Sequence, residues 1–417
     1  MNLYRLELKR VCKTRMTAIL LAIALVLAVV MAYLPVTFIG WTELDASGNE
    51  VRYTGLKAIR KRQEQQVSGT ITPDVMQEAL EAYQRVYRQH DASSINDIPV
   101  EVFYKELARY QPLVNNAKEA FADSKTGMAP GVMGLTAEDM QNFYSQLPKR
   151  LESVIWLEQS GKPGYEQAQA IAQKKFDAVQ KPFTYSFGVS SDAMDYQTLL
   201  SLLLTLLCAV IAAPVFASDA QTGPQDIQLC TKNGGLRLAA AKLAAAFSIT
   251  GAAYLLCGVV WILVTNALFG WESTKTSVQW LFSVTSLLPY TVGQMEWIML
   301  VTNFLIFFAE VAFVLMASVW AKNNLTALSV ALISVVAPLI VYMVVPGSFG
   351  EWLSTLLPAG GIGLSNALLY KMISFDFLYA GRHAFFQADV LLASAPVKIV
   401  LLVGLAAWGY LRKTKVA

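Results

Sequence analysis

Charged residues and histidines are scarce in this sequence of 417 residues. Charged residues make up 15% of it and histidine occurs twice, whereas apolar residues make up 55%. A soluble domain carries about 25% charged and about 45–50% apolar residues. The composition therefore argues strongly against a purely soluble enzyme and predicts a chain that is largely embedded in lipid.

Cysteine is also rare. The four cysteines are Cys12, Cys208, Cys230 and Cys257, and none lies in the hydrophilic segment 41–195. That segment therefore has no disulfide framework, and the chain has no CxxC or Cys/His spacing of the kind that holds structural zinc. We expect no metal site.

Motifs that carry chemistry are absent as well. No G-x-x-x-x-G-K-[ST] loop occurs, so the chain cannot bind nucleotide phosphates in the usual way. No HExxH motif and no plausible serine hydrolase triad occurs, and the basic residues form no patch with interleaved aromatics. We expect a chain without catalytic residues or a cofactor of its own, and without nucleic acid as a partner.

Long apolar runs are what the sequence does contain. A helix needs about 20 apolar residues to cross the hydrocarbon core. We therefore predict an all-α polytopic membrane protein with six spanning helices. The predicted spans are residues 17–40, 196–218, 241–269, 296–321, 325–346 and 394–411.

Two further apolar stretches, 276–295 and 352–370, contain Pro289 and Pro358. Each is compatible with a short span, an interfacial helix or a re-entrant hairpin. Cytoplasmic loops carry an excess of Lys and Arg. Six spans with a cytoplasmic N-terminus satisfy this rule better than eight. The predicted cytoplasmic pieces then hold Arg5, Lys9, Arg10, Lys13, Arg15, Lys232, Arg237, Lys242, Lys322, Arg412, Lys413 and Lys415.

This topology makes the chain a protein of the cell (plasma) membrane, with both termini in the cytoplasm. It places residues 41–195 outside as a domain-sized segment with 17 Lys/Arg and 21 Asp/Glu, a net charge of −4. It also makes residues 347–393 external. They are too apolar for a solvated loop, so we predict a re-entrant helical element there, before the last span.

The segment 41–195 shows helical periodicity. Thr72 before Pro73 is typical of a helix start, and Thr136 with Asp139 predicts a capping box. Its aromatic residues, among them Tyr83, Tyr87 and Trp156, are better explained by helix packing than by ligand recognition. No motif in this helical domain identifies a substrate.

Two charged segments flank the predicted membrane helices. Residues 1–16 have Tyr4, Leu8, Val11 and Cys12 on one side of a helix, which predicts an amphipathic helix on the cytoplasmic surface rather than a simple basic tail. Between spans two and three, segment 218–236 mixes polar and apolar residues and contains Gly234-Gly235. From its residues alone, this segment is equally compatible with an ordinary membrane-surface loop.

The spacing in that segment resembles the ABC-2-type permease family, the membrane subunits of one class of ATP-binding-cassette exporters. The family pattern is an acidic residue, three intervening residues and a Gly, then an apolar position and a Thr, then an Arg and a Lys at the start of span three. The matching positions here are Asp219, Gly223, Leu229, Thr231, Arg237 and Lys242. The N-terminal run LYRLELKRVCKTRMTAILLAIAL and the turn MASVWAKNNLTALSV at 316–330 also look like family features, whereas Pro224 departs from the helix-forming residue usual there.

The resemblance implies a permease that works with partners. It implies two cytoplasmic ATPase subunits, which bind ATP and Mg²⁺, and a second permease that is a copy or a paralogue. It implies that segment 218–236 docks on the ATPase as a coupling helix. The residues expected to make this contact are Asp219, Gly223, Ile227, Leu229, Thr231 and Arg237.

Charged residues inside the predicted spans are a separate signal. Glu310 lies in the middle of span four, where a charged side chain costs about 2.5–3.5 kcal/mol on insertion scales. It is explained equally well as a group that lines a transport path or a permease interface and as a hydrogen-bonded packing residue. We expect Glu296 to lie at the outer membrane interface without a special role.

Three functions are compatible with these observations. The favoured one is the permease subunit of an exporter. The second is a mechanotransmitting or sensory complex, in which an ATPase moves the external domain without moving a substrate. The third is an ATPase-independent receptor or anchor that displays the external helices.

Overall fold

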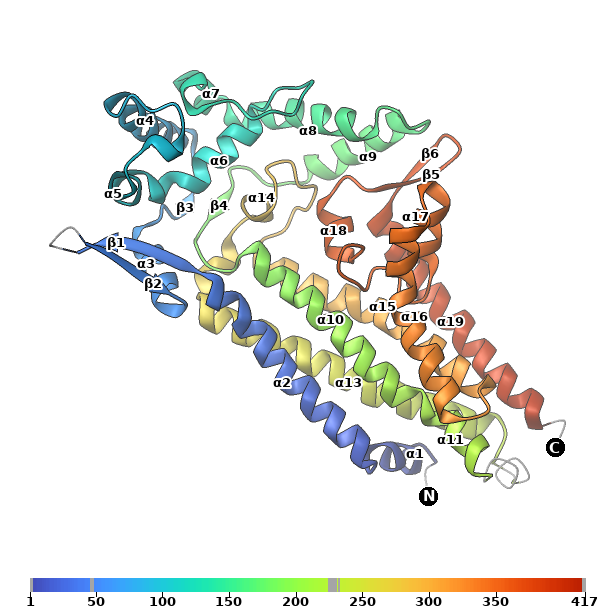
Figure 1. The fold of residues 1–417 in the computed structure, drawn as a ribbon. Helices are drawn as coiled ribbons and strands as arrows, with labels where there is room; N and C mark the ends of the chain where they lie inside the picture. The colour runs from blue at the N-terminus through green and yellow to red at the C-terminus, as the bar shows by residue number, and fades with distance from the viewer. Residues whose placement is uncertain (1–2, 46–48, 224–230, 232, 415–417) are drawn as a thin grey trace.

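The computed structural model describes residues 3–45, 49–223, 231 and 233–414. It consists of a bundle of long helices that run side by side and a domain of shorter helices at one end of the bundle (Figure 1). Both termini lie at the opposite end of the bundle. We call the two ends the domain end and the terminal end.

Six helices of the described chain are long and apolar enough to cross a membrane, which confirms the predicted number and a multi-pass membrane protein. They are α2 (Arg15–Phe38), α10 (Ser191–Ala212) continued by α11 (Pro214–Thr222), α13 (Leu236–Phe269), α15 (Val292–Trp320), α16 (Asn324–Val344) and α19 (Gln387–Thr414).

Several boundaries differ from the prediction. The second spanning helix begins at Ser191, so the segment between the first two spanning helices ends before residue 195. Helix α13 begins at Leu236, and α19 begins at Gln387. The first turns of α10 and α19 contain residues that are buried against other parts of the protein, such as Ala193 and Ala388, whereas Leu236 and Arg237 in the first turn of α13 are exposed. Apolar length underestimates all three helices.

The domain between α2 and α10 is mainly helical. Helix α4 starts where Thr72 accepts a hydrogen bond from the backbone of Val75, and Thr136 and Asp139 form the predicted capping box. Asn142 separates the short helix that follows this box from the next helix. The helices are α3 (Leu56–Gln65), α4 (Pro73–Gln89), η1 (Ile95–Asp97), α5 (Val100–Val102), η2 (Phe103–Leu107), η3 (Ala108–Tyr110), α6 (Gln111–Ala120), η4 (Val132–Gly134), α7 (Ala137–Gln141), α8 (Phe143–Gln159) and α9 (Tyr165–Asp177).

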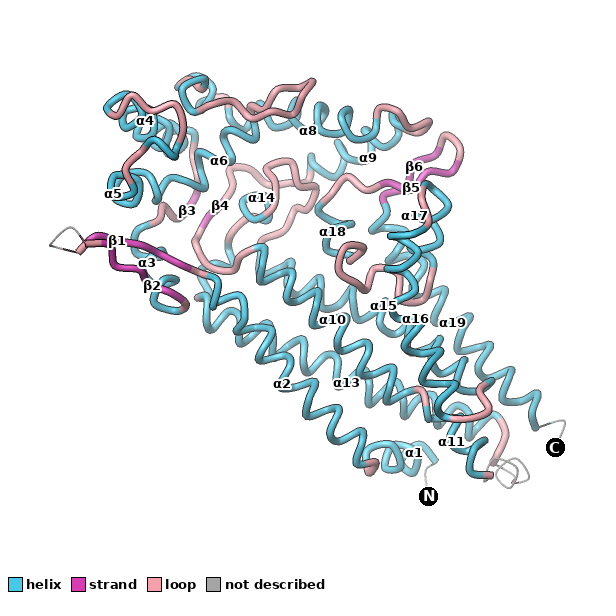
Figure 2. The backbone as a smooth tube through the Cα atoms, in the orientation of Figure 1, coloured by secondary structure: helices cyan, strands magenta, loops and turns pink. Residues whose placement is uncertain are grey.

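In the part of the chain that the structure describes, the prediction of an all-α chain misses three small antiparallel sheets of two strands each (Figure 2). Strand β1 (Gly40–Leu44) pairs with β2 (Glu50–Thr54), β3 (Gly69–Thr70) pairs with β4 (Thr184–Tyr185), and β5 (Phe377–Ala380) pairs with β6 (His383–Phe386). Each has at most five residue pairs, which is too short for a clear alternation in the sequence.

The stretch 276–295 forms no spanning helix of its own, and its ends pair antiparallel between Ser277 and Thr291. It contains the short helix α14 (Val278–Leu281), which follows η5 (Trp271–Lys275), and then the first turn of α15. Trp280 packs between Phe143 and Phe183 of the domain, with ring centroids 6.4 and 6.1 Å away. The stretch is apolar because the domain covers it.

The predicted external region 347–393 holds two short helices, α17 (Gly347–Leu356) and α18 (Leu368–Ile373). The hairpin β5–β6 and the start of α19 follow them, and both were not predicted. The amide of Gln159 in the domain donates to the carbonyl of Phe375 at 2.8 Å, and Tyr379 donates to Gln159 at 2.9 Å. The region is therefore also part of the contact between bundle and domain.

Candidate functional site

The terminal end of the bundle contains a break between α10 and α11. Pro214 interrupts the helix because it has no backbone N–H to donate. The hydroxyl of Ser318 on α15 lies against this break. It accepts hydrogen bonds from the backbone of Phe216 and Ala217, each at 3.1 Å, and donates to the carbonyl of Ala213 at 2.6 Å. The break is thereby held against α15.

The short helix α11 carries Asp219, whose side chain is buried. Its carboxylate accepts a hydrogen bond from Arg10 of α1 (Leu3–Cys12) at 2.8 Å. It also pairs with Lys242 of α13, which is 1% exposed. Arg10 further donates to the carbonyl of Val215 at 3.0 Å and pairs with Glu7 at 3.0 Å. We call Glu7, Arg10, Asp219 and Lys242 the basal charge cluster.

The basal charge cluster connects three helices that are distant in the chain. Helix α1 precedes the first spanning helix, α11 ends the second and α13 is the third. A buried charge is costly unless it is paired, and Asp219 has a cation at each of its two oxygens. The cluster therefore holds α1, α11 and α13 together at the terminal end, directly before the chain segment that links α11 to α13.

The residues predicted to contact an ATPase lie in different surroundings. Asp219 is turned inward to Arg10 and Lys242. Gly223 ends α11 with a φ of +87°, a left-handed conformation that favours glycine, and a Cβ there would meet no atom within 4 Å. Thr231 and Arg237 are exposed, and Arg237 donates to Asn233 at 3.2 Å. Ile227 and Leu229 lie outside the described residues.

Sequence reasoning paired Asp219 with Lys242 only as members of one pattern, and it treated Arg10 solely as a topology signal. One further signal for Arg10 is present in the sequence: the spacing of Glu7 and Arg10 puts this acid and this base on one side of α1. That spacing does not reveal which helix lies opposite, so Asp219 could not be identified as the partner.

Two carboxylates lie deeper in the bundle. Glu310 is fully buried, as its place in mid-span suggests, and Ser334 of α16 donates to its Oε1 at 2.5 Å. Its Oε2 has no hydrogen-bond partner among the described residues. Lys398 of α19 is near enough to interact with it electrostatically and donates to the carbonyls of Thr355 and Leu357, each at 3.0 Å.

Glu296, which we expected at the outer membrane interface without a special role, lies near the start of α15. It is 0% exposed, and Asn266 of α13 donates to its Oε2 at 2.6 Å. Gln197 of α10 donates to its backbone carbonyl at 2.9 Å. The charge of Glu296 suggests contact with water, whereas α10 and α13 cover this turn of α15. Spans two, three and four are therefore joined at the domain end by a buried polar cluster.

The three aromatic residues singled out in the domain differ in their burial. Tyr83 and Tyr87 are 3% and 6% exposed and belong to the domain core, as the packing interpretation predicts. Trp156 is 48% exposed. The domain surface also has a polar pocket of about 350 Å³ lined by charged residues of α4, η2 and η3. Within the described ranges, no group of three or more His, Cys, Asp or Glu side chains is placed to hold a metal ion.

Comparison with known proteins adds no assignment. The chain matches no protein-family model, no curated protein and no solved structure.

Proposed function

We propose that this chain is the membrane-spanning permease subunit of an ATP-driven exporter, powered by separate ATPase subunits that dock on segment 218–236. The observation that carries the proposal is the basal charge cluster. It ties α1, α11 and α13 together at the point where this segment leaves and re-joins the bundle.

The proposed coupling follows from these connections. A partner can shift a protein between two states only through contacts that differ between the states. A partner that moves the segment after Gly223 would pull on α11 and on the start of α13 together, because Asp219 and Lys242 are paired. Arg10 would carry the same movement to α1 and, through it, to the first span.

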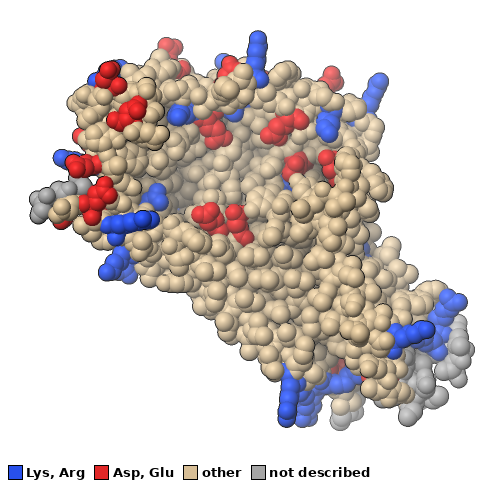
Figure 3. All heavy atoms as spheres, in the orientation of Figure 1, with Lys and Arg blue, Asp and Glu red and all other residues tan. Residues whose placement is uncertain are grey.

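Charge supports the orientation. Lys and Arg gather at the terminal end on the face shown in Figure 3, and the exposed residues there include Arg5, Lys9 and Arg412. An excess of basic residues marks the cytoplasmic side. In this proposal both termini are cytoplasmic, the chain lies in the cell membrane, two ATPase subunits hold ATP and Mg²⁺, and a second permease completes the complex.

The first experiment is purification of the chain from native membranes with identification of what accompanies it. An ATPase that co-purifies in equal amount is the expected result. Its absence would favour an ATPase-independent receptor or anchor and would contradict the proposal.

Coupling is tested in the purified complex in liposomes. Charge reversal at Asp219 with a bulky residue at Gly223 should uncouple ATP hydrolysis from transport, but it also breaks the buried ion pair. Exposed positions give a sharper test. Arg237→Glu with Thr231→Trp should reduce ATPase stimulation and transport while the permease keeps its melting temperature. Lys105→Glu, at an exposed position on the domain, is the control. Equal activity of the wild type, the Arg237→Glu/Thr231→Trp variant and the control would contradict the proposed docking segment.

Mechanotransmission is the second candidate, favoured by the close attachment of the domain. Gln63 of α3 donates to the carbonyls of Phe269 and Phe187 at 2.5 and 3.2 Å, so the domain is bonded to the end of α13. A movement of α13 would reach the domain through these bonds. ATP-dependent change in the domain without movement of any solute in liposomes would support this function over export.

A further inference from the structure

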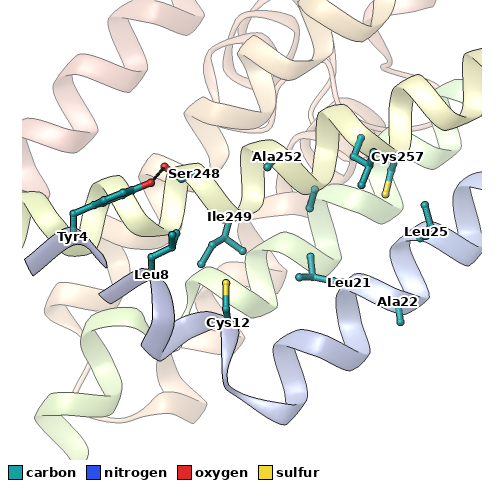
Figure 4. Close-up of a pocket in the computed structure, with 12 residues that line it drawn as sticks. Tyr4, Leu8, Cys12, Leu21, Ala22, Leu25, Ser248, Ile249, Ala252 and Cys257 are labelled. Atoms are coloured by element: carbon teal, nitrogen blue, oxygen red, sulfur yellow. Dashed lines mark hydrogen bonds between the residues drawn. The ribbon is translucent and has the colours of Figure 1, made fainter. Parts of the chain in front are cut away.

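An apolar pocket of about 620 Å³ opens at the terminal end between α1, α2 and α13 (Figure 4). Helix α1 contributes Tyr4, Leu8 and Cys12, which lie one turn apart along one side of the helix. Its opposite walls are Leu21, Ala22 and Leu25 of α2, and Ser248, Ile249, Ala252, Ala253, Leu256 and Cys257 of α13. Tyr4 donates a hydrogen bond to Ser248 at 2.9 Å and closes one end of the pocket.

The sides of α1 have three different surroundings. Glu7 and Val11 are buried against the bundle, and Tyr4, Leu8 and Cys12 line the pocket. Consecutive residues of an α-helix are about 100° apart, so Arg5 and Lys9 each lie next to a pocket residue on the side away from the bundle. Both are exposed, as is Lys13 just beyond the helix.

The position of the pocket restricts its occupant. It lies along two membrane-spanning helices, and its lining is almost entirely apolar, so an acyl chain fits it and a polar solute does not. If the acyl chain of a lipid fills the pocket, the headgroup of that lipid would lie beside the exposed cations of α1. Arg10 on the same helix is engaged with Asp219, whereas Arg5, Lys9 and Lys13 are directed to the surface.

We propose that this pocket binds one anionic phospholipid of the surrounding bilayer. The acyl chain would lie between α1, α2 and α13, and the phosphate would pair with Arg5 and Lys9. Basic residues next to an amphipathic helix attract anionic lipid. The apolar pocket adds a defined site to this general attraction.

The test is native mass spectrometry of the full chain in detergent, incubated with equal amounts of dioleoyl phosphatidylglycerol and dioleoyl phosphatidylcholine. The wild type should retain several-fold more phosphatidylglycerol. Ala252→Trp and Leu25→Trp fill the pocket from opposite walls and should abolish this retention. Val26→Trp, at the position that follows Leu25 and is 61% exposed outside the pocket lining, is the matched control and should retain the lipid.

Arg5→Glu with Lys9→Glu should bring the ratio of the two retained lipids close to one while the total amount retained persists. Equal retention of both lipids by the wild type would overturn the proposal, as would wild-type retention by both Trp variants.

A second measurement, which needs no substitution inside the pocket, keeps the proposal testable if the Trp variants do not fold. Cys12 is exposed and lines the pocket, whereas Cys208 and Cys257 are buried. In a Cys230→Ser chain, reaction of Cys12 with a maleimide should be several-fold slower in phosphatidylglycerol vesicles than in phosphatidylcholine vesicles. Equal rates would overturn the proposal.

Discussion

The carboxylate of Asp219 and the ammonium of Lys242 form a buried ion pair between residues 23 positions apart, across the segment that links α11 to α13. Arg10 adds a second cation to the same carboxylate. This arrangement gives Asp219 an internal structural role, whatever surface contacts the linking segment makes.

Removal of Asp219 should destabilise the protein strongly. Asp219→Ala leaves Lys242 buried without its carboxylate, and breaking a buried pair in this way costs about 3–5 kcal/mol. We expect a clear fall in the melting temperature of the detergent-purified chain. Arg237→Ala is the control: it removes an exposed cation from α13, the helix of Lys242, and should change stability by less than about 0.5 kcal/mol.

The double replacement Asp219→Leu with Lys242→Met tests the pairing itself. Apolar residues of similar size often replace a buried pair at little cost. We expect a melting temperature closer to that of the wild type than Asp219→Ala shows. A double variant less stable than Asp219→Ala would indicate that Asp219 and Lys242 do not act as a pair.

The sequence predicted the elements governed by local or one-dimensional signals. The six spanning helices follow from apolar length, and the cap at Thr136 follows from its spacing to Asp139. The partners of buried polar groups did not follow. Glu296 and Asn266 lie 30 residues apart on different helices, and nothing in their spacing reveals that the two helices meet there.

The same limit explains the misread ends of the helices. Polar first turns such as that of α10 look like loop in a hydropathy pattern, although Ser190 caps this helix by accepting a hydrogen bond from the backbone of Ala193. Stretch 276–295 stayed undecided because an apolar segment covered by a domain and one covered by lipid have similar compositions. Trp280 settles it by packing on Phe143 and Phe183.

The buried contact between Glu296 and Asn266 should be a coupled unit. Asn266→Leu leaves Glu296 without its side-chain donor, and an unsatisfied buried polar group costs about 1–3 kcal/mol, more when it is charged. Glu296→Gln keeps an acceptor for Asn266 and should keep or raise the melting temperature. A double-mutant cycle of Glu296→Leu and Asn266→Leu should give a coupling energy of about 0.5–3 kcal/mol. Simple additivity would contradict the contact.

Glu310 is predicted to matter for transport more than for folding. Glu310→Gln keeps an acceptor for Ser334, so the melting temperature should be preserved, while transport by the complex in liposomes should fall. Ser334→Ala removes the donor and should lower stability by about 1–3 kcal/mol. Unchanged transport by Glu310→Gln would identify Glu310 as a packing residue.

The stability of the domain should depend on pH through Glu119. Burial raises the pKa of this carboxyl, and hydrogen bonds from Ser283, at 2.5 Å, and from the backbone of Val284 offset part of the shift. The unfolded chain therefore loses the proton at a lower pH than the folded chain. Glu119 costs no stability below the ordinary glutamate pKa, and its cost grows as pH rises and is complete above the raised pKa.

Glu119→Gln removes this cost, because Gln stays neutral and still accepts a hydrogen bond from Ser283. The variant should melt at the same temperature as the wild type near pH 4 and higher near pH 8, by roughly 2–4 °C for each kcal/mol recovered in a domain of this size. Glu152→Gln, at an exposed position on α8, is the control and should show no such difference between the two pH values. A gain of Glu119→Gln at pH 4 that equals its gain at pH 8 would mean that the effect comes from packing, since only ionisation of Glu119 makes the gain grow with pH.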